Sequence, residues 1–279
     1  MPSRPNPAQP TPAAIPPAIP PAIAAALALA DPSWQPVLRR GLAAMVAADP
    51  AYLPALAVDA YLPTGQRLFA AFAQPLPAVR YVLVGEGPYP RAASATGVCF
   101  MDGAVAGLWS AGGLSTPVNR ATSLRNFIKM LLVAERQLAP DNTGGAALAP
   151  IAAAALAPGS GRIQTLPELQ ARLTGHGFLL LNAALVFRPH VAPLLDARAW
   201  LPLLQVVLDS LAESASDAGR PAPLLVLWGK IAEQLKRLPA TARLPQVQSE
   251  HPYNLSFIVN PAMLALFGPL QLLHAGPAA

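Results

Sequence analysis

The stretch that decides the fold is VRYVLVGEGPYPRAASATGVCF, residues 79–100. Residues 81–84 form an apolar run with the length and the branched side chains of a buried β-strand. The run stops at residues 85–88, Gly-Glu-Gly-Pro, where two glycines and a proline predict a tight turn. Because open α/β sheets bind ligands at the carboxyl ends of parallel strands, this turn is a candidate ligand site.

Two aromatic residues flank the loop that follows the turn. Tyr89 comes directly after the proline, and Phe100 ends a second short apolar run, residues 98–100. Together they would wall a flat pocket. As ordinary core residues they would instead supply buried apolar area, as aromatic side chains commonly do. The residues alone leave both interpretations open.

The composition indicates a protein of about one domain with a mild basic excess. The chain has 279 residues, a formal charge of +5 and 12% charged residues, which is compatible with a nucleic-acid partner. No apolar run reaches the roughly 18 residues of a membrane span. Cys99 is the single cysteine, which excludes an intramolecular disulfide and a multi-cysteine zinc or iron–sulfur site. The N-terminus lacks a basic-then-apolar signal pattern. We expect a cytoplasmic monomer without a metal.

Two segments differ in composition from the rest of the chain. Residues 1–30 are dense in proline and alanine, which disfavours helix and sheet, and we predict a disordered arm. Residues 141–162 are a low-complexity run of Ala, Gly and Pro, which we predict to be a surface insertion too poor in large apolar residues to build core. The region from 31 to 279 is predicted to form one folded domain that contains this insertion.

Strand-like and helix-like segments alternate along this region. Apolar runs that resemble buried strands recur at residues 178–181 and 223–227. Apolar residues at helical spacing are found in residues 37–56, 123–132 and 200–211. The alternation predicts a single α/β domain with a central, mainly parallel four-stranded sheet flanked by helices.

Four motifs, in this order, resemble those of the uracil-DNA glycosylases of the main bacterial and eukaryotic type. The family carries Gly-Gln-Asp-Pro-Tyr-His and then Gly-Leu-Cys-Phe, where this chain has Gly-Glu-Gly-Pro-Tyr-Pro at residues 85–90 and Gly-Val-Cys-Phe at 97–100. The family's Leu-Leu-Leu-Asn-Ala is identical at residues 179–183. Its Leu-Leu-Trp-Gly strand is similar to residues 223–230, and its His-Pro-Ser-Pro-Leu-Ser resembles residues 251–256.

The resemblance implies the fold of that family and its activity in base excision repair. Such enzymes turn uracil out of single- or double-stranded DNA and hydrolyse its N-glycosidic bond without a cofactor. The matching substrate-binding residues are Gly85, Gly87, Tyr89, Phe100 and Asn182. The Asn182 amide offers a donor and an acceptor that match the N3–H and O4 edge of uracil. Considered without the motif, a strand-end asparagine often only caps a turn.

The resemblance also implies catalytic and DNA-binding residues. The imidazole that matches His251 donates to uracil O2 as the base departs as an anion, although a lone histidine is often structural. Leu255 matches the wedge that enters the minor groove, and Ser256 is a candidate DNA contact. Ser123 matches a serine that lies against a DNA phosphate. Alternatively, Thr122 or Ser123 is simply the N-cap of the helix over 123–132.

The chain differs from the family in the first motif, at the position of the family's catalytic aspartate. The family's aspartate, which stabilises the sugar cation and positions water, is replaced by Gly87, and the histidine that follows by Pro90. Three interpretations remain. The first is an active glycosylase in which Glu86 supplies the carboxylate, since a glutamate also follows the first glycine in the iron–sulfur uracil-DNA glycosylases. The second is a module that binds uracil or damaged DNA without cutting it. The third is a diverged paralogue with no role on DNA.

Overall fold

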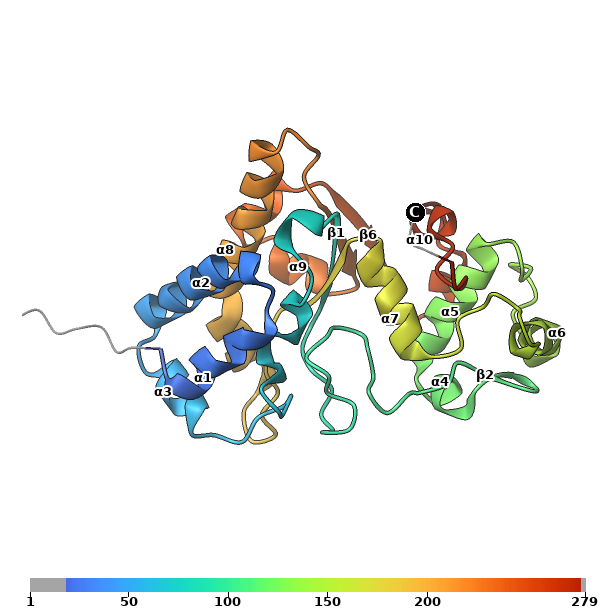
Figure 1. The fold of residues 1–279 in the computed structure, drawn as a ribbon, viewed down its shortest axis with the longest axis horizontal. Helices are drawn as coiled ribbons and strands as arrows, with labels where there is room; N and C mark the ends of the chain where they lie inside the picture. The colour runs from blue at the N-terminus through green and yellow to red at the C-terminus, as the bar shows by residue number, and fades with distance from the viewer. Residues whose placement is uncertain (1–18, 277–279) are drawn as a thin grey trace, which may run out of the picture.

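The computed structural model describes residues 19–276. At its centre is a sheet of four parallel strands in the order β4-β1-β5-β6, with helices on both faces (Figure 1). The predicted α/β fold with a central, parallel four-stranded sheet is confirmed. The strands are β1 (Tyr81–Gly85), β4 (Phe178–Asn182), β5 (Leu224–Trp228) and β6 (Gln246–Ser249).

Strands β1, β4 and β5 send alternate side chains into two hydrophobic clusters, one on each face of the sheet. In β1, Val82 and Val84 belong to the first cluster and Leu83 to the second. In β4, Leu179 belongs to the first cluster and Leu180 to the second. Because both faces are buried, these strands are apolar at nearly every position, and their sequences read as continuous runs.

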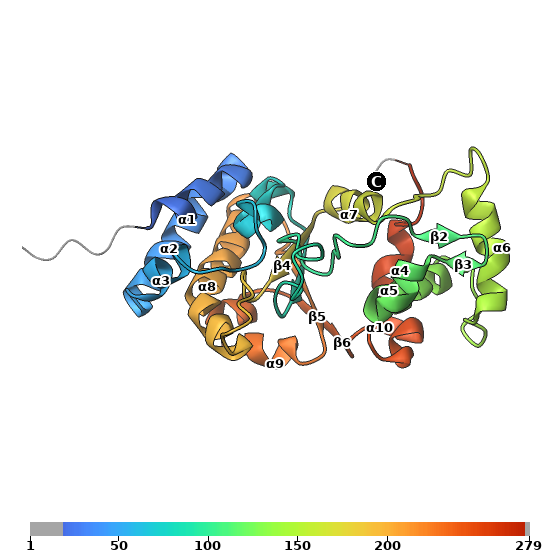
Figure 2. The same cartoon turned by 90° about the horizontal axis from the view of Figure 1, so that it is seen from below.

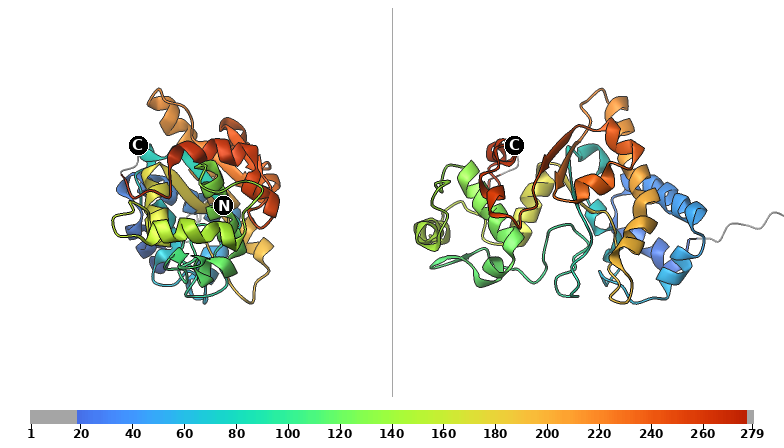
Figure 3. Two further views of the ribbon diagram at one scale, coloured as in Figure 1. Left: turned by 90° about the vertical axis from the view of Figure 1, so that its right-hand side faces the viewer. Right: turned by 180° about the vertical axis from the view of Figure 1, so that it is seen from behind.

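The helices form one layer on each face of the sheet (Figures 1 and 3). In the first layer α2 packs along α8 so closely that a Cβ at Gly41 would lie 2.9 Å from Cγ of Leu203. The buried side chains of the first layer come mainly from α1 (Pro21–Ala26), α2 (Gln35–Ala48), α3 (Tyr52–Ala57), α8 (Pro193–Asp217) and α9 (Ile231–Leu235). Those of the second layer come from α4 (Thr116–Arg120), α5 (Thr122–Ala134), α6 (Gly145–Leu156), α7 (Leu166–Gly175) and α10 (Pro261–Phe267). Between residues 19 and 276, none of the helices has the length and apolar character that a bilayer crossing requires.

The predicted N-terminal arm is partly a folded element. Helix α1 and the 3₁₀ turn after it bury Ile23, Ala26 and Leu27 in the first cluster. Pro21 occupies the first position of the helix, where its missing N–H costs no hydrogen bond. The prediction of disorder is therefore wrong for residues 21–30, and the folded domain begins before residue 31. Residues 1–18 lie outside the described residues.

The low-complexity insertion contains helix α6, which packs on a hairpin of β2 (Trp109–Ser110) and β3 (Gly113–Leu114), as Figure 2 shows. Leu148 and Ala152 of α6 are buried in the second cluster. The prediction that residues 141–162 build no core is therefore wrong. One leucine and several alanines are enough, because small side chains let the helix approach the glycine-rich hairpin closely.

Candidate active site

The carboxyl ends of β1, β4 and β5 meet at one edge of the sheet and border a cavity of about 210 Å³. The strand register aligns Gly85 at the end of β1 with Asn182 at the end of β4. The cavity is smaller than the roughly 300–1,000 Å³ of pockets for drug-sized ligands, so it suits a single small ring. Eight of the ten predicted site residues line it: Gly85, Glu86, Gly87, Tyr89, Phe100, Ser123, Asn182 and His251.

Asn182 and Gly85 lie side by side where their strands end. Asn182 is only 4% exposed and lines the cavity. A Cβ at Gly85 would lie 2.5 Å from Sγ of Cys99 and 3.1 Å from Oδ1 of Asn182, so this position requires glycine. Burial raises the pKa of the Cys99 thiol to about 12, which keeps it protonated and unreactive. Cys99 therefore packs the strand ends together and takes no part in the chemistry.

Tyr89 and Phe100 form an aromatic wall of the cavity, and Phe100 packs against the second hydrophobic cluster. Phe100 has a left-handed backbone (φ 68°), which bulky residues rarely adopt outside functional sites. Its ring meets Phe127 at 5.4 Å and Trp228 at 5.3 Å between centroids, both edge to face. The Tyr89 hydroxyl donates to the Phe100 carbonyl at 3.4 Å, and burial holds the pKa of Tyr89 well above its ordinary value. The sequence left open whether this pair lines a pocket or belongs to the core. In the structure both residues line the cavity, and Phe100 also packs against the core.

The imidazole of His251 has a defined tautomer. Its Nδ1 accepts a hydrogen bond from the main-chain N–H of Tyr253 at 3.1 Å, so in the neutral ring the proton is on Nε2. Burial lowers the pKa of His251 below its usual 6.5, and the Glu86 carboxylate opposes this shift in part. At neutral pH the cavity is therefore bordered by an uncharged imidazole that has an N–H group to donate.

The loop that carries His251 is held from two sides. The buried Asn126 in α5 donates from Nδ2 to the carbonyls of Pro252, at 2.8 Å, and Tyr253, at 3.3 Å. Gly229, with φ 64°, follows β5, and a Cβ there would lie 3.0 Å from Cβ of His251. Only glycine suits this close approach in a left-handed conformation. The loop is thus clamped between α5 and the end of β5.

Glu86 and Gly87 differ in what they contribute to the cavity wall. Glu86 and His251 both line the cavity, and the negative charge of the Glu86 carboxylate acts to raise the pKa of His251 against the effect of burial. The Glu86 carbonyl accepts from the main-chain N–H of Ala184 at 3.1 Å, which fixes the turn. A Cβ at Gly87 would lie 3.7 Å from the Ala184 carbonyl oxygen, an ordinary contact. The backbone at residue 87 thus has room for a side chain that the sequence does not supply.

Of the three predicted DNA-binding residues, Ser123 lines the cavity, and Leu255 and Ser256 follow His251 in the chain. The N-cap of α5 is Ala121 and the helix begins at Thr122, so the prediction that Thr122 or Ser123 caps it is wrong. Ser123 instead lies in the first turn, with its side chain in the cavity lining. Leu255 is 69% exposed, and it and Ser256 lie outside the cavity lining, in a 3₁₀ turn over Leu255–Val259.

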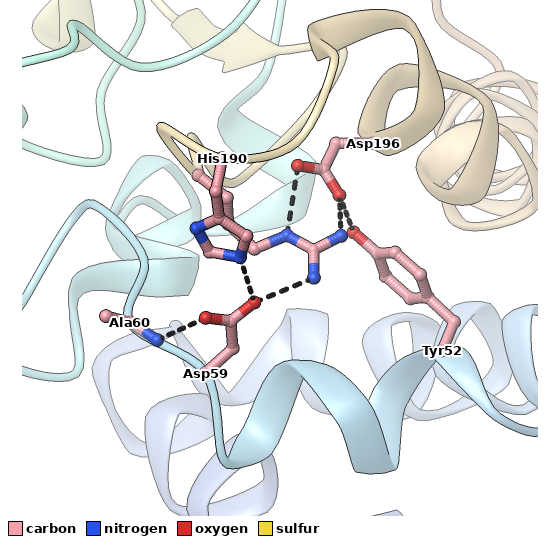
Figure 4. A network of polar contacts seen from close by, with 6 residues as sticks. Tyr52, Asp59, Ala60, His190 and Asp196 are labelled. Atoms are coloured by element: carbon pink, nitrogen blue, oxygen red, sulfur yellow. Dashed lines mark hydrogen bonds and ion pairs between the residues drawn. The ribbon is translucent and has the colours of Figure 1, made fainter.

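A polar network anchors the loop after β4 to the N-terminal helices (Figure 4). Arg188 pairs with Asp196 at 2.6 Å and with Asp59 at 3.0 Å. The Tyr52 hydroxyl donates to Asp196 at 2.7 Å, and His190 lies 3.0 Å from Asp59. Because two carboxylates already hold the guanidinium, Arg188 acts as a structural cation and not as a free phosphate contact.

Sequence reasoning missed several residues of the site. Trp228 lies in the run that resembles the family's Leu-Leu-Trp-Gly strand and was not among the predicted site residues, yet this residue lines the cavity. Its position at the end of an apolar strand was a usable signal, because strand ends form the site. Thr96 and Ile231 also line the cavity, and no pattern singled them out. The clamp by Asn126 joins residues 126 positions apart, which no local pattern reveals.

The most informative comparison is with a solved structure, the wild-type UNG of Nitratifractor salsuginis. It is 38% identical, the alignment covers 90% of this chain and 96% of that one, and the TM-score is 0.80. Mimivirus uracil-DNA glycosylase, at 17% identity and a TM-score of 0.50 over 81% of this chain and 71% of that one, shares the fold.

Curated relatives agree with this comparison. The uracil-DNA glycosylase of Nocardioides sp. is 28% identical over 70% of this chain and 66% of its own length, so the match spans about two thirds of that relative. That of Mycobacterium avium is 27% identical over 82% of this chain and 83% of its own length. No protein-family model matches the sequence. By the identity and coverage of the Nitratifractor structure, and by the agreement of the curated relatives, the chain belongs to the uracil-DNA glycosylase family.

Proposed function

We propose that this protein is a DNA repair enzyme that turns uracil out of DNA and hydrolyses its N-glycosidic bond. The observation that carries the proposal is that the Asn182 amide and the neutral His251 imidazole border the same small cavity at the strand ends. One group reads a base edge and the other donates to a departing base. Membership of the uracil-DNA glycosylase family supports the same activity.

Recognition of uracil depends on the shape of the cavity and on one amide. The Asn182 side chain offers an acceptor for N3–H and a donor for O4, a pattern that cytosine reverses. Phe100 stacks on the flat face of the base, and Tyr89 fills the space that a thymine methyl group would need. Gly85 and Gly87 let the ring approach the backbone closely. The edge-to-face contacts of the Phe100 ring and the hydrogen bond of the Tyr89 hydroxyl to the Phe100 carbonyl support a rigid pocket that selects by shape.

Catalysis depends on charge that develops as the bond breaks. The base leaves as an anion, and the Nε2–H of His251 donates to its O2 atom. Preorganised donors of this kind are typically worth about 10²–10³ in rate. A neutral imidazole is suited to this role because it gains hydrogen-bond strength as the negative charge grows. The Tyr253 N–H bond to Nδ1 and the lowered pKa of His251 support it.

The sugar that loses its base becomes positively charged and must be met by a carboxylate and a water. We assign this role to Glu86, which lines the same cavity as His251 and whose negative charge acts on the pKa of that imidazole. Its side chain starts one residue before the position where the family carries aspartate, so the rate is expected to be reduced.

The DNA strand is held at the rim of the cavity. Ser123 and the free N–H groups of the first turn of α5 suit a phosphate. Leu255 is the wedge that fills the space of the flipped nucleotide in a duplex, and Ser256 contacts the strand beside it. The exposure of Leu255 supports this role, because an apolar side chain in water gains by insertion. The protein acts as a cytoplasmic monomer on single or double strands.

The replacement of aspartate by Gly87 favours one alternative, a protein that binds uracil-containing DNA without cutting it. Measuring the release of free uracil from a single-stranded oligonucleotide, beside a gel shift of the same strand, separates the two. The proposal predicts uracil release that a cytosine-containing strand does not give and that His251→Ala lowers by about 10²–10³. Binding without any release would refute the enzyme and leave the binding module.

A further inference from the structure

The loop that carries His251 also presents a large aromatic side chain to solvent. Tyr253 is 67% exposed and stands two residues before Leu255, the proposed wedge, which is 69% exposed. We propose that Tyr253 is a stacking platform for the nucleobase adjacent to the flipped uridine, most effective on single-stranded DNA. This inference rests on the proposed function, because it assumes that a uracil-containing strand enters the cavity.

The position of Tyr253 suits the neighbouring base. Its main-chain N–H is bonded to Nδ1 of His251, whose ring borders the cavity. With consecutive Cα atoms about 3.8 Å apart, the Cα atoms of the two residues are at most about 7.6 Å apart. Stacked nucleotides of one strand are separated by about 3.4 Å, and a Tyr side chain bridges the remaining distance. The aromatic ring therefore lies within reach of a base one step from the flipped nucleotide.

The backbone beneath Tyr253 is fixed. Asn126 donates to the Tyr253 carbonyl at 3.3 Å and to the Pro252 carbonyl at 2.8 Å. The main-chain N–H of Asn254 donates to the His251 carbonyl at 2.9 Å, and its side chain to the same oxygen at 3.2 Å. Only the two side-chain torsions of Tyr253 remain to be ordered on binding. Because the backbone is already fixed, stacking of the ring costs little conformational entropy.

The chemistry of the position has changed relative to the family motif. Tyr253 and Asn254 stand where the family carries a Ser-Pro pair, so a short hydroxyl side chain is replaced by a ring. Every base has a π-face, so stacking on tyrosine accepts any neighbouring sequence. In a single strand the neighbouring base has no partner strand to pair with and is free to stack on protein. The substitution therefore exchanges a hydroxyl contact for a base contact.

The test measures binding of a strand that the enzyme does not cut, in which 2′-fluoro-2′-deoxyuridine replaces deoxyuridine. A second strand is identical except that the nucleotides on both sides of the uridine are abasic. Tyr253→Ala should weaken binding of the first strand by roughly five- to 150-fold and leave binding of the second unchanged. Tyr253→Phe should bind both strands like wild type. Leu156→Ala, which removes an exposed leucine at the end of α6, is the matched control and should change neither.

Salt dependence separates stacking from phosphate contact. Because stacking releases no counterions, the slope of log K against log salt should be the same for wild type and Tyr253→Ala. Equal losses on both strands, no loss on the first strand, or a loss in Tyr253→Phe equal to that in Tyr253→Ala would each overturn the proposal. Wild-type protein that binds the first strand but releases no uracil from its cleavable counterpart refutes the enzyme activity and leaves the stacking comparison valid. Wild-type protein that binds neither strand overturns both.

Discussion

Asn126, buried in α5, donates from its side-chain amide to the main-chain carbonyl of Pro252 at 2.8 Å, across 126 positions of sequence. This bond links the helix whose first turn borders the cavity to the loop that carries His251. The same peptide group, between Pro252 and Tyr253, supplies the N–H that fixes the tautomer of the imidazole. The orientation of the His251 imidazole, the proposed donor, thus depends on an amide that lies outside the cavity lining.

Replacing Asn126 by alanine should therefore lower the rate of uracil release by more than the loss of stability alone explains. A displacement of about 1 Å at a catalytic group costs up to about a hundredfold in rate, and we expect a loss of that order. Single-turnover release and the midpoint of thermal unfolding are measured together. Gln74→Ala is the matched control, because the buried Gln74 amide donates to the Phe178 carbonyl at 2.8 Å, at the start of β4 and so away from the cavity. If both variants lose rate in proportion to stability, Asn126 has no positioning role.

The ionisation of His251 gives a second prediction. Its pKa is lowered from 6.5 by burial, so the ring is neutral at pH 7 and gains a proton only as the pH falls through the lowered value. Activity should decline over the same range, since the charged ring has no lone pair for the Tyr253 N–H. Glu86→Gln removes the negative charge that favours the imidazolium form and should lower the pKa further. An NMR titration of the imidazole measures this. Glu213→Gln, at an exposed glutamate of α8, is the control. A His251 pKa that rises in Glu86→Gln would contradict the assigned geometry.

The parts of the fold that the sequence predicted are those where local pattern and burial agree. Strands β1, β4 and β5 are apolar runs because both of their faces are covered. Strand β6 was not predicted, because it is an edge strand in which only Val247 and Ser249 are partly buried and its sequence is not an apolar run. Helix α1 was not predicted, because the prolines around it indicated disorder. Ile23 and Leu27 are nevertheless four residues apart, the spacing of one helical face.

Residues of the candidate site, like the strands, could be predicted where a local sequence pattern marks them. Most residues that line the cavity stand at strand ends or in the motifs that follow them, and those positions can be read from the sequence, whereas Thr96 and Ile231 cannot. The contacts that orient them cannot be read, because they join distant segments. Asn126 to Pro252 and Gly229 to His251 are examples. The proposed roles of the lining residues are what the remaining predictions test.

Base selection should depend on the Asn182 amide. In Asn182→Asp an ionised carboxylate replaces the group that donates to uracil O4, so uracil release should fall by about a hundredfold or more. The same carboxylate accepts from the amino group of cytosine, so cytosine release should appear. Both are measured by separating free bases after incubation with matched strands. An unchanged uracil rate would remove Asn182 from the site.

The wedge role of Leu255 predicts a difference between substrates. Turning a nucleotide out of a duplex costs a few kcal/mol of unstacking and unpairing, whereas a single strand requires much less. Leu255→Ala should therefore slow uracil release from duplex DNA by about tenfold or more and from single strands much less. Leu29→Ala, at an exposed leucine beyond α1, should have no effect on either. Equal losses on the two substrates would mean that Leu255 serves only the packing of its loop.

The missing aspartate gives the sharpest prediction, because the structure has room for it. A Cβ at Gly87 meets nothing closer than the Ala184 carbonyl oxygen at 3.7 Å, so a Cβ is accommodated without a shift of the backbone. Gly87→Asp should restore a carboxylate at the sugar and raise uracil release by about a hundredfold. Gly87→Asn, of the same size but uncharged, is the matched control and should not. If both raise the rate equally, the gain comes from packing and not from charge.

The same experiment decides the role of Glu86. In the wild-type background Glu86→Gln should abolish most of the uracil release, because the carboxylate is then lost and nothing replaces it. In the Gly87→Asp background the same change should cost far less, since the introduced aspartate already stabilises the sugar cation. The two losses would be equal only if Glu86 acted independently of that charge, for example through the turn it holds with Ala184. A wild-type rate that survives Glu86→Gln unchanged would exclude Glu86 as the substitute carboxylate. If wild type and Gly87→Asp both fail to release uracil while still binding the strand, the protein is a binding module.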